Sequence, residues 1–322
     1  MALSLGTLSL YTKQLVEPLL TSAVIGAKTQ QLIMDGGIVI PKAKSAVQIP
    51  LMDTDAVFQA DGCGYSPSGT TSFTQRTITV GKIQVSETIC PKNFEAYFTQ
   101  ELLKAGSTYE DFGNAQFLEA YLAKKNARIA AQIETAIWQG DVTGSGGANL
   151  NKFDGLIRLI DLGSPVDANV SGFTGVSGSP ISTVTATNVV AATEGIYKAI
   201  PAEVMAKGDV KIFCGYDWYR LLILAYRALN LFSYNPQDVN AQSFILPGTN
   251  IEVVPVNGLN GTGDAYAISL SNMAMAVDLE NEEANYRVWY SEDNDEIRTK
   301  VAFKVGVNVA FTNEVVKFKA AI

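Results

Sequence analysis

Three segments of unusual pattern follow one another in this chain and together restrict its fold more than any single motif. Two extended segments within residues 46–90 come first, joined by a stretch rich in glycine and serine. A helical pattern follows over residues 107–140, and an alternating strand occupies residues 300–311. Each strand of the first pair could run for about 15 residues, which is about 50 Å at the usual rise. An isolated two-stranded ribbon is marginally stable in water, so this one is expected to lean on a surface outside its own domain.

Alternation of apolar residues supports the ribbon at residues 46–90. The first strand shows it in these residues: Val47, Ile49 and Leu51. In the second strand the alternation changes phase at Gly81, which predicts a bulge or twist there. Tyr65, Phe73 and Arg76 lie near the ribbon tip, where they have no core of their own. Aromatic and arginine side chains are the usual anchors of protein interfaces, so we predict that these three contact a neighbouring subunit.

Residues 107–140 have the pattern of one long helix. Ser107 and Glu110 form a capping box at its start, each accepting a hydrogen bond from the other's backbone amide. Apolar residues recur along one side: Leu118, Leu122, Ile129, Ile133 and Ile137. Cations mark a solvated or interface side: Lys124, Lys125 and Arg128. The helix would be about 45–50 Å long at 1.5 Å per residue, which is typical of a structural spine.

Helices and strands alternate between the long helix and the final strand, which predicts an α/β lobe. Its expected elements are helices at 188–200 and 216–230 and strands at 210–214, 251–256, 265–270 and 286–290. The glycine-rich stretch 258–263 lacks the lysine of a phosphate loop and is expected to be a hairpin connection. The final strand has one apolar face: Val301, Phe303, Val305, Val307, Val309 and Phe311. Its alternation shifts after residues 312–314, which predicts a bend there, and the strand is expected to return to the long helix.

The residue inventory argues against most enzyme chemistry. Histidine is absent from all 322 residues, which excludes Ser–His and Cys–His nucleophile pairs and imidazole metal ligands. Cys63, Cys90 and Cys214 have no metal-site spacing and are expected to be free thiols. The acidic stretch 278–296 lacks the ligand spacing of a calcium loop. We therefore predict no catalytic residue, no cofactor and no metal site.

Charge and hydropathy restrict the partners. The formal net charge is −8 and no basic run occurs, which argues against strong nucleic-acid binding through phosphate contacts. Only 17% of the residues are charged, which suits a subunit that buries much of its surface against partners. Residues 1–10 lack the features of a signal peptide, and no apolar run is long enough to cross a bilayer. The chain is therefore expected to be made and folded in the cytoplasm.

The order of these segments, with residues 133–141 followed by Phe153, Asp154, Gly155 and Leu156, resembles the major capsid proteins of tailed bacteriophages, which have the Hong Kong 97-type fold. The resemblance implies an α+β fold with an N-terminal arm, an extended β-ribbon loop, a peripheral domain built on a spine helix, and an α/β axial domain. The implied boundaries are 1–45 for the arm, 46–90 for the loop, 91–150 for the peripheral domain, 151–290 for the axial domain and 291–322 for C-terminal strands returning to the peripheral domain.

The resemblance also implies a function and partners. The chain would self-assemble into hexamers and pentamers of an icosahedral capsid that encloses double-stranded DNA without sequence-specific contact. Portal, scaffolding and cement proteins would be its other partners, with no membrane. It would be assembled in the bacterial host cytoplasm and reside in the virion capsid, with no enzymatic role.

Three alternatives stay open from the sequence. The nearest is an encapsulin, a bacterial cargo-enclosing shell with the same fold. A histidine-free hydrolase with a carboxylate site is weaker, because no spacing selects a carboxylate pair. A tail-tube or fibre subunit would rarely carry so long a helix.

Overall fold

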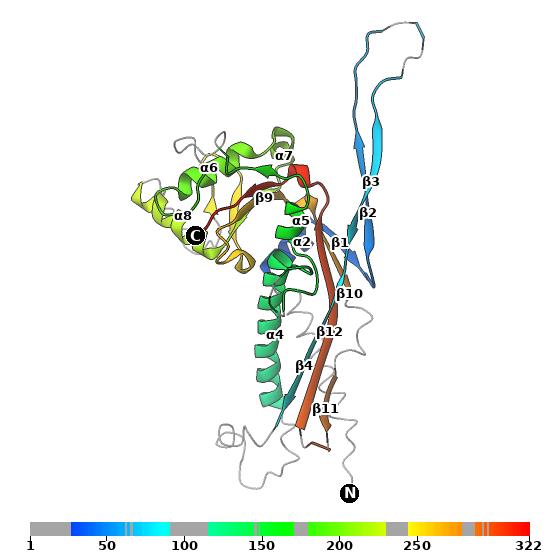
Figure 1. Cartoon of the computed structure of the whole chain (residues 1–322), viewed down its shortest axis with the longest axis vertical. Coiled ribbons are helices and arrows are strands. Elements are labelled where there is room, and N and C mark those ends of the chain that lie inside the picture. Colours follow the sequence, from blue (N-terminus) through cyan, green and yellow to red (C-terminus); the bar gives the residue numbers. More distant parts are fainter. Residues whose placement is uncertain are drawn as a thin grey trace.

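The computed structural model describes residues 27–61, 63–64, 67–90, 115–144, 147, 149–170, 180–229, 244–278, 287–291, 293–294 and 296–322. They form an elongated body, an α/β lobe beside it and a ribbon that projects from the body (Figure 1). The predicted capping box at Ser107 and the first part of the predicted arm lie outside the described residues.

A five-stranded sheet, here called the peripheral sheet, forms the elongated body. Its strands are β1 (Ile38–Pro41), β4 (Gly81–Ile89), β10 (Met273–Asp278), β11 (Arg287–Ser291) and β12 (Glu296–Val309). The long strand β12 pairs antiparallel with β4, β10 and β11, while β1 lies parallel to β10. Three helices accompany it: α2 (Lys28–Gly36), α4 (Ala115–Gln139) and α5 (Leu156–Asp161).

The predicted spine helix and final strand share one core. On β12 the alternate residues of one face are buried: Val301, Phe303, Val305, Val307 and Val309. Ile129, Ile133 and Ile137 of α4 belong to the same apolar cluster. Burial of one such side chain stabilises the fold by about 1.5–3 kcal/mol, so this seam accounts for much of the stability of the body. The helix is confirmed over Ala115–Gln139. The strand is confirmed with other bounds, because β12 ends at Val309 and Phe311, which was predicted on its apolar face, lies beyond it and is only partly buried.

A six-stranded sheet, here called the axial sheet, forms the α/β lobe, with the order β5-β13-β9-β6-β8-β7. Its strands are β5 (Val166–Asp167), β6 (Val210–Cys214), β7 (Phe244–Ile245), β8 (Glu252–Pro255), β9 (Ala265–Ser269) and β13 (Val316–Phe318). Its helices are α6 (Val189–Ala199), α7 (Ala202–Lys207) and α8 (Tyr216–Ala228). Trp218 on α8 is buried edge-on against Phe318 of β13, with ring centroids 5.2 Å apart.

The predicted ribbon of residues 46–90 is too long. Only β2 (Val47–Thr54) and β3 (Thr71–Ile78) pair as a two-stranded sheet, whereas β4 pairs with β12 in the peripheral sheet. The phase change at Gly81 marks the transfer between the two sheets. A side chain at Gly81 would lie 2.4 Å from the Lys152 carbonyl oxygen, so only glycine fits this close passage.

Other boundaries also change. In the peripheral sheet, β12 pairs with β10 and β11. No strand was predicted at the position of β10. The strand at the position of β11 was predicted to belong to the axial domain. The predicted bend is confirmed as a 3₁₀ turn, Thr312–Glu314, but β13 beyond it joins the axial sheet. The predicted hairpin at residues 258–263 is wrong, because β6 lies between β8 and β9. Residues 258–263 therefore form a crossover connection.

The peripheral and axial parts meet at the C-terminal end of α4. Trp138 is fully buried there, and its ring centroid lies 5.4 Å from that of Phe213 and 5.8 Å from that of Tyr266. Gln139 Nε2 donates a hydrogen bond of 2.7 Å to the carbonyl oxygen of Gly258. A side chain at Gly258 would lie 2.3 Å from the Trp138 ring, so the connection between β8 and β9 is held close to α4.

A carboxylate from α4 caps the start of α2. The N-cap residue Ala27 has no side chain that could bond to the first-turn amides. The Thr29 amide donates instead to Glu134 Oε2 (3.1 Å), and the Thr29 hydroxyl donates to Glu134 Oε1 (2.5 Å). Trp138 Nε1 donates in turn to Thr29 Oγ1 (2.8 Å). Burial raises the pKa of Glu134, although the hydrogen bonds from Thr29 oppose this shift.

Candidate subunit interface

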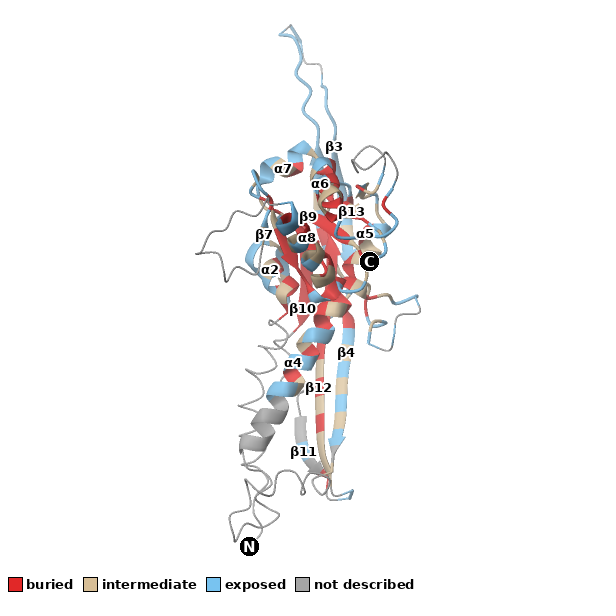
Figure 2. Ribbon diagram, turned by 90° about the vertical axis from the view of Figure 1, so that its left-hand side faces the viewer, coloured by how far each residue is buried: buried red, intermediate tan, exposed pale blue. Residues whose placement is uncertain are grey.

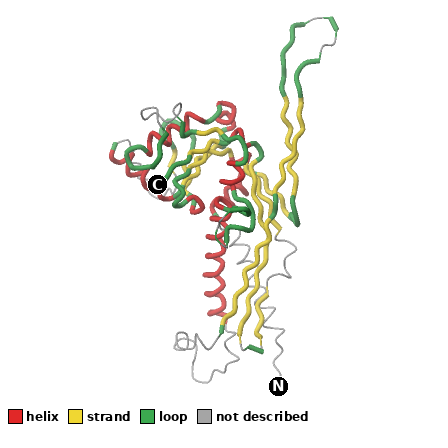
Figure 3. Tube along the Cα trace, viewed as in Figure 1, coloured by secondary structure: helices red, strands yellow, loops and turns green. Residues whose placement is uncertain are grey.

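The ribbon of β2 and β3 projects from the body (Figures 1 and 3). Its antiparallel register runs from Val47 opposite Ile78 to Thr54 opposite Thr71. Figure 2 shows that exposed residues predominate along its outer part, in contrast to the buried sheets at the centre of the molecule. The outer part therefore has no core within the described chain.

The base of the ribbon is anchored on the peripheral sheet. A small apolar cluster joins the two: Ala43, Ile49, Ile78, Ala274 and Ala276. Asn308 Nδ2 on β12 donates a hydrogen bond of 2.7 Å to the Thr77 carbonyl oxygen on β3. These contacts fix the direction in which the ribbon leaves the body.

The loop that joins β2 and β3 requires glycine at position 69, next to the end of the strand pairing. The Asp55 amide donates to the Thr70 carbonyl oxygen at 2.9 Å, one step beyond the last paired residues of β2 and β3. Gly69 has φ +90°, and a side chain there would lie 2.8 Å from the Asp55 carbonyl oxygen. Both observations require a residue without a Cβ atom, so Gly69 sets the path of the tip.

The two faces of the ribbon differ in chemistry. Met52 and Phe73 are directly opposite each other, and they are 59% and 77% exposed. Arg76 is opposite Ile49 on the other face, which packs on the peripheral sheet at the base. Phe73 and Arg76 therefore point to opposite faces of the ribbon, because residues three apart on a strand alternate in direction. Tyr65 lies outside the described residues.

Two exposed apolar residues near the tip were missed by the sequence reasoning. Phe58 is 100% exposed and Val57 is 52% exposed. The glycine- and serine-rich residues that follow predict a turn, but this pattern does not indicate whether Val57 and Phe58 are exposed. These two residues add to the exposed Met52–Phe73 pair of β2 and β3, so the outer ribbon exposes apolar side chains on its strands and in its loop.

Acidic residues give the outer ribbon its charge. Asp53, Asp55 and Asp61 are all exposed, and residues 45–75 contain no lysine or arginine. Asp53 lies on the face opposite Met52, because successive residues of a strand alternate. Within β2 the face opposite Met52 carries Leu51 and Asp53, so the acidic residues of the outer ribbon are one aspartate on the strand and two beyond its end.

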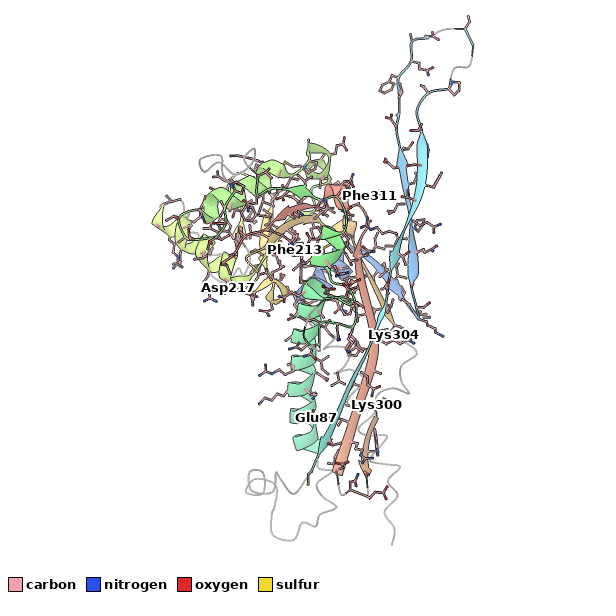
Figure 4. The ribbon with its side chains drawn as sticks, viewed as in Figure 1. Glu87, Phe213, Asp217, Lys300, Lys304 and Phe311 are labelled. Carbon is pink, nitrogen blue, oxygen red and sulfur yellow. The ribbon has the colours of Figure 1, made fainter. Side chains whose placement is uncertain are left out.

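Charged side chains elsewhere in the described part of the chain form ion pairs at several separate places, including Arg158 with Asp141 and Asp154. Figure 4 shows Glu87, Lys300 and Lys304 along the peripheral strands, while Asp217 lies on the α/β lobe. Glu87 pairs with Lys125 of α4, and Lys304 Nζ lies 2.9 Å from Asp278 Oδ2. Both are ion pairs between neighbouring elements of the fold.

Within the described residues, no group of three or more histidine, cysteine, aspartate or glutamate side chains is placed to hold a metal ion. The three cysteines are free thiols, and burial raises the pKa of Cys214, which makes it a poor nucleophile. None of the helices in the described part of the chain is long and apolar enough to cross a membrane.

Comparison with solved structures identifies proteins of similar fold. The satellite phage P4 procapsid, in a structure that includes the size determination protein Sid, matches with a TM-score of 0.59 and 12% identity, over 94% of this chain and 89% of that one. Gordonia phage Cozz matches with a TM-score of 0.54 and 11% identity, over 90% and 86% of the two chains.

The capsid of an empty GTA particle matches with a TM-score of 0.53 and 14% identity, over 90% and 89% of the two chains. No protein-family model matches the chain, and no curated protein does. The likeness is therefore one of tertiary structure over nearly the full length, at very low sequence identity. The chain has the Hong Kong 97-type fold of tailed-phage capsid proteins.

Proposed function

We propose that this chain is the major shell subunit of a tailed-phage capsid. Copies of it would form hexamers and pentamers that close into an icosahedral container around double-stranded DNA. The observation that carries the proposal is the projecting ribbon, whose outer part exposes Met52, Phe58 and Phe73 in a chain with the fold of capsid subunits. Exposed apolar side chains on a projecting segment are typical of a surface that binds another subunit.

The proposed role is mechanical. Each ribbon would cover a surface of a neighbouring copy, and many modest contacts would add up because every subunit is held by several others. The net charge of −8 suits a wall that does not adhere to packaged DNA. Portal, scaffolding and cement proteins are further partners in this proposal.

The first experiment removes the ribbon tip without disturbing its base. Residues 56–69 are replaced by Asn-Gly, a two-residue hairpin turn that suits the closing hydrogen bond between Asp55 and Thr70. We expect a folded chain, by circular dichroism, that forms no shells by negative-stain microscopy and light scattering. Normal shells from this variant would refute the proposed role of the ribbon.

A milder variant separates apolar contact from simple shortening. Met52→Ser combined with Phe73→Ser removes the cross-strand apolar pair, and Gln75→Ser on the same face of β3 is the matched control. The double variant should reduce shell yield at least tenfold, whereas the control should assemble like the unmodified chain. Equal yields from both would show that this apolar face makes no interface.

The contents of the particles distinguish a phage capsid from a cargo compartment. Particles purified from cells with the complete phage should protect double-stranded DNA from nuclease. Protein cargo without DNA would favour the encapsulin alternative and overturn the DNA-container proposal.

A further inference from the structure

The last residues of the chain lie against the α/β lobe (Figure 1). The Ala321 amide donates a hydrogen bond of 2.9 Å to the Ser182 carbonyl oxygen. Asn169 Nδ2 donates to the Lys319 carbonyl oxygen at 2.7 Å. Residues 319–322, here called the C-terminal segment, are therefore held on the axial part by their backbone, beyond the end of β13.

The C-terminal segment also lies against the residues that lead into β9. A side chain at Gly263 would lie 2.2 Å from the Ala320 carbonyl oxygen, so the two backbones pass very close to each other. The next residue, Asp264, is half-buried and accepts a hydrogen bond of 3.4 Å from the hydroxyl of the buried Tyr266. The backbone of Ala320 also stabilises the ionised Asp264 carboxylate. This carboxylate is therefore close to the C-terminal segment.

An ion-pair cluster ties the same segment to the peripheral part. Lys319 pairs with Asp161, the last residue of α5, and Lys317 Nζ lies 3.6 Å from Asp161 Oδ1. Leu156 and Ile160 of α5 are fully buried in the core that α4 and β12 share. The end of the chain therefore connects the peripheral part, through α5, with the axial sheet.

The docked segment and the proton on Asp264 favour each other. Burial raises the pKa of Asp264 to about 6, and the negative charge of Asp161 acts in the same direction, while Lys319, the Tyr266 hydroxyl and the Ala320 backbone oppose the shift. Detachment of the segment would expose Asp264 to water, and its pKa would return toward its ordinary value of 3.8. Docking is therefore strongest below pH 3.8 and weakens as the pH rises through about 6.

We propose that the C-terminal segment is a proton-controlled latch, which docks on α5 and the start of β9 when Asp264 is protonated and loosens when Asp264 is ionised. The latch itself does not depend on the proposed shell function, but its use in assembly does. A chain that fills both hexamers and pentamers must hold its peripheral and axial parts at slightly different angles. A connection that loosens at neutral pH would permit this adjustment.

Hydrogen exchange of the unassembled chain tests the latch. Exchange rates at about pH 5 and about pH 8 are divided into the intrinsic rates at each pH, which gives protection factors for the C-terminal peptide and for peptides of β6. The linkage predicts that protection of the C-terminal peptide falls about tenfold between these pH values, and falls less in β6. Asp264→Asn should keep the protection high at both pH values, because its side chain stays neutral. Asp35→Asn, on the exposed side of α2, is the matched control and should behave like the unmodified chain.

Two further variants separate the latch from other effects. Asp161→Asn removes the partner of Lys319, so it should lower the protection of the C-terminal peptide at both pH values. Glu134→Gln should leave the C-terminal peptide unchanged, because Glu134 bonds to α2. Protection that does not change with pH in the unmodified chain would overturn the latch, as would an equal change in β6 or an unchanged pH dependence in Asp264→Asn.

Shell formation tests the use of the latch. Asp264→Asn should form shells at least tenfold less efficiently than the unmodified chain at neutral pH, because its latch stays docked. Equal yields would overturn the role in assembly, although the latch would stand on the exchange data. If the unmodified chain forms no shells even with its phage proteins present, the proposed function fails, and the exchange result on unassembled chains still decides the latch.

Discussion

Replacing Glu134 by alanine should destabilise the fold far more than a typical substitution. The change removes the acceptor of two hydrogen bonds from Thr29, whose amide lies 3.1 Å and whose hydroxyl lies 2.5 Å from the carboxylate. A hydrogen bond to a charged acceptor contributes about 1.5–3 kcal/mol. Relief from burying the carboxylate offsets part of this loss. We expect the free energy of unfolding to fall by about 2–4 kcal/mol, within the range seen for lost buried networks.

The measurement is equilibrium urea unfolding of unassembled chains, followed by circular dichroism. Glu134→Gln is the matched control, because its amide oxygen can still accept from the Thr29 amide, and it should lose about half as much stability. Hydrogen exchange should show faster exchange in α2 than in α6 for the alanine variant, since the cap acts on α2. A loss below about 0.5 kcal/mol, the level of an ordinary surface substitution, would refute the capping argument.

The same carboxyl group predicts a pH dependence. Burial raises the pKa of Glu134 above its ordinary value of 4.5, so the folded state holds this proton more tightly than the unfolded chain. The stabilisation from the group is then complete below pH 4.5 and is lost as the pH rises through the folded pKa. Glu134→Gln should remove this slope, and an unchanged slope in that variant would assign it to another group.

Three further predictions follow from other parts of the fold. Ile133→Asp places an unpaired charge in the core beneath α4 and should lower stability by about 4–5 kcal/mol or more, so soluble chain with an unchanged circular dichroism spectrum would contradict it. Gly81→Ala brings a Cβ to within 2.4 Å of the Lys152 carbonyl oxygen and should lower the free energy of unfolding by about 1–3 kcal/mol, measured by urea unfolding, whereas Lys82→Ala beside it should not. Burial raises the pKa of Asp264 from 3.8 to about 6, so the free energy of unfolding should decrease as the pH rises between these two values. Asp264→Asn should remove this pH dependence of the free energy of unfolding.

Local periodicity accounts for what the sequence alone determined. The seam between α4 and β12 follows from the 3.6-residue repeat around Ile133 and the two-residue repeat around Phe303, and both patterns appear in the structure. In the axial part, β6 has the predicted bounds and α8 ends two residues earlier than predicted. These elements were predictable because each apolar pattern depends only on neighbours within the same element.

The exposed surface of the ribbon was only partly predictable. Sequence reasoning placed exposed contact residues near the tip and included Phe73, which the structure exposes. It grouped Phe73 with Arg76, which lies on the opposite face, and it missed Phe58. Which face of a ribbon stays exposed depends on how its base docks, and here the docking partner, β10, is about 200 residues away in the chain.

Tertiary structure alone decided the pairing of strands and the capping of α2. The sequence marks a change of phase at Gly81 but does not show that β4 leaves the ribbon for β12. Nor does it show that β6 separates β8 from β9, or that Glu134 caps a helix about 100 residues before it. Backbone hydrogen bonds are chemically alike in every strand, so local sequence cannot choose among partners. That choice depends on which arrangement buries the apolar faces of all elements at once.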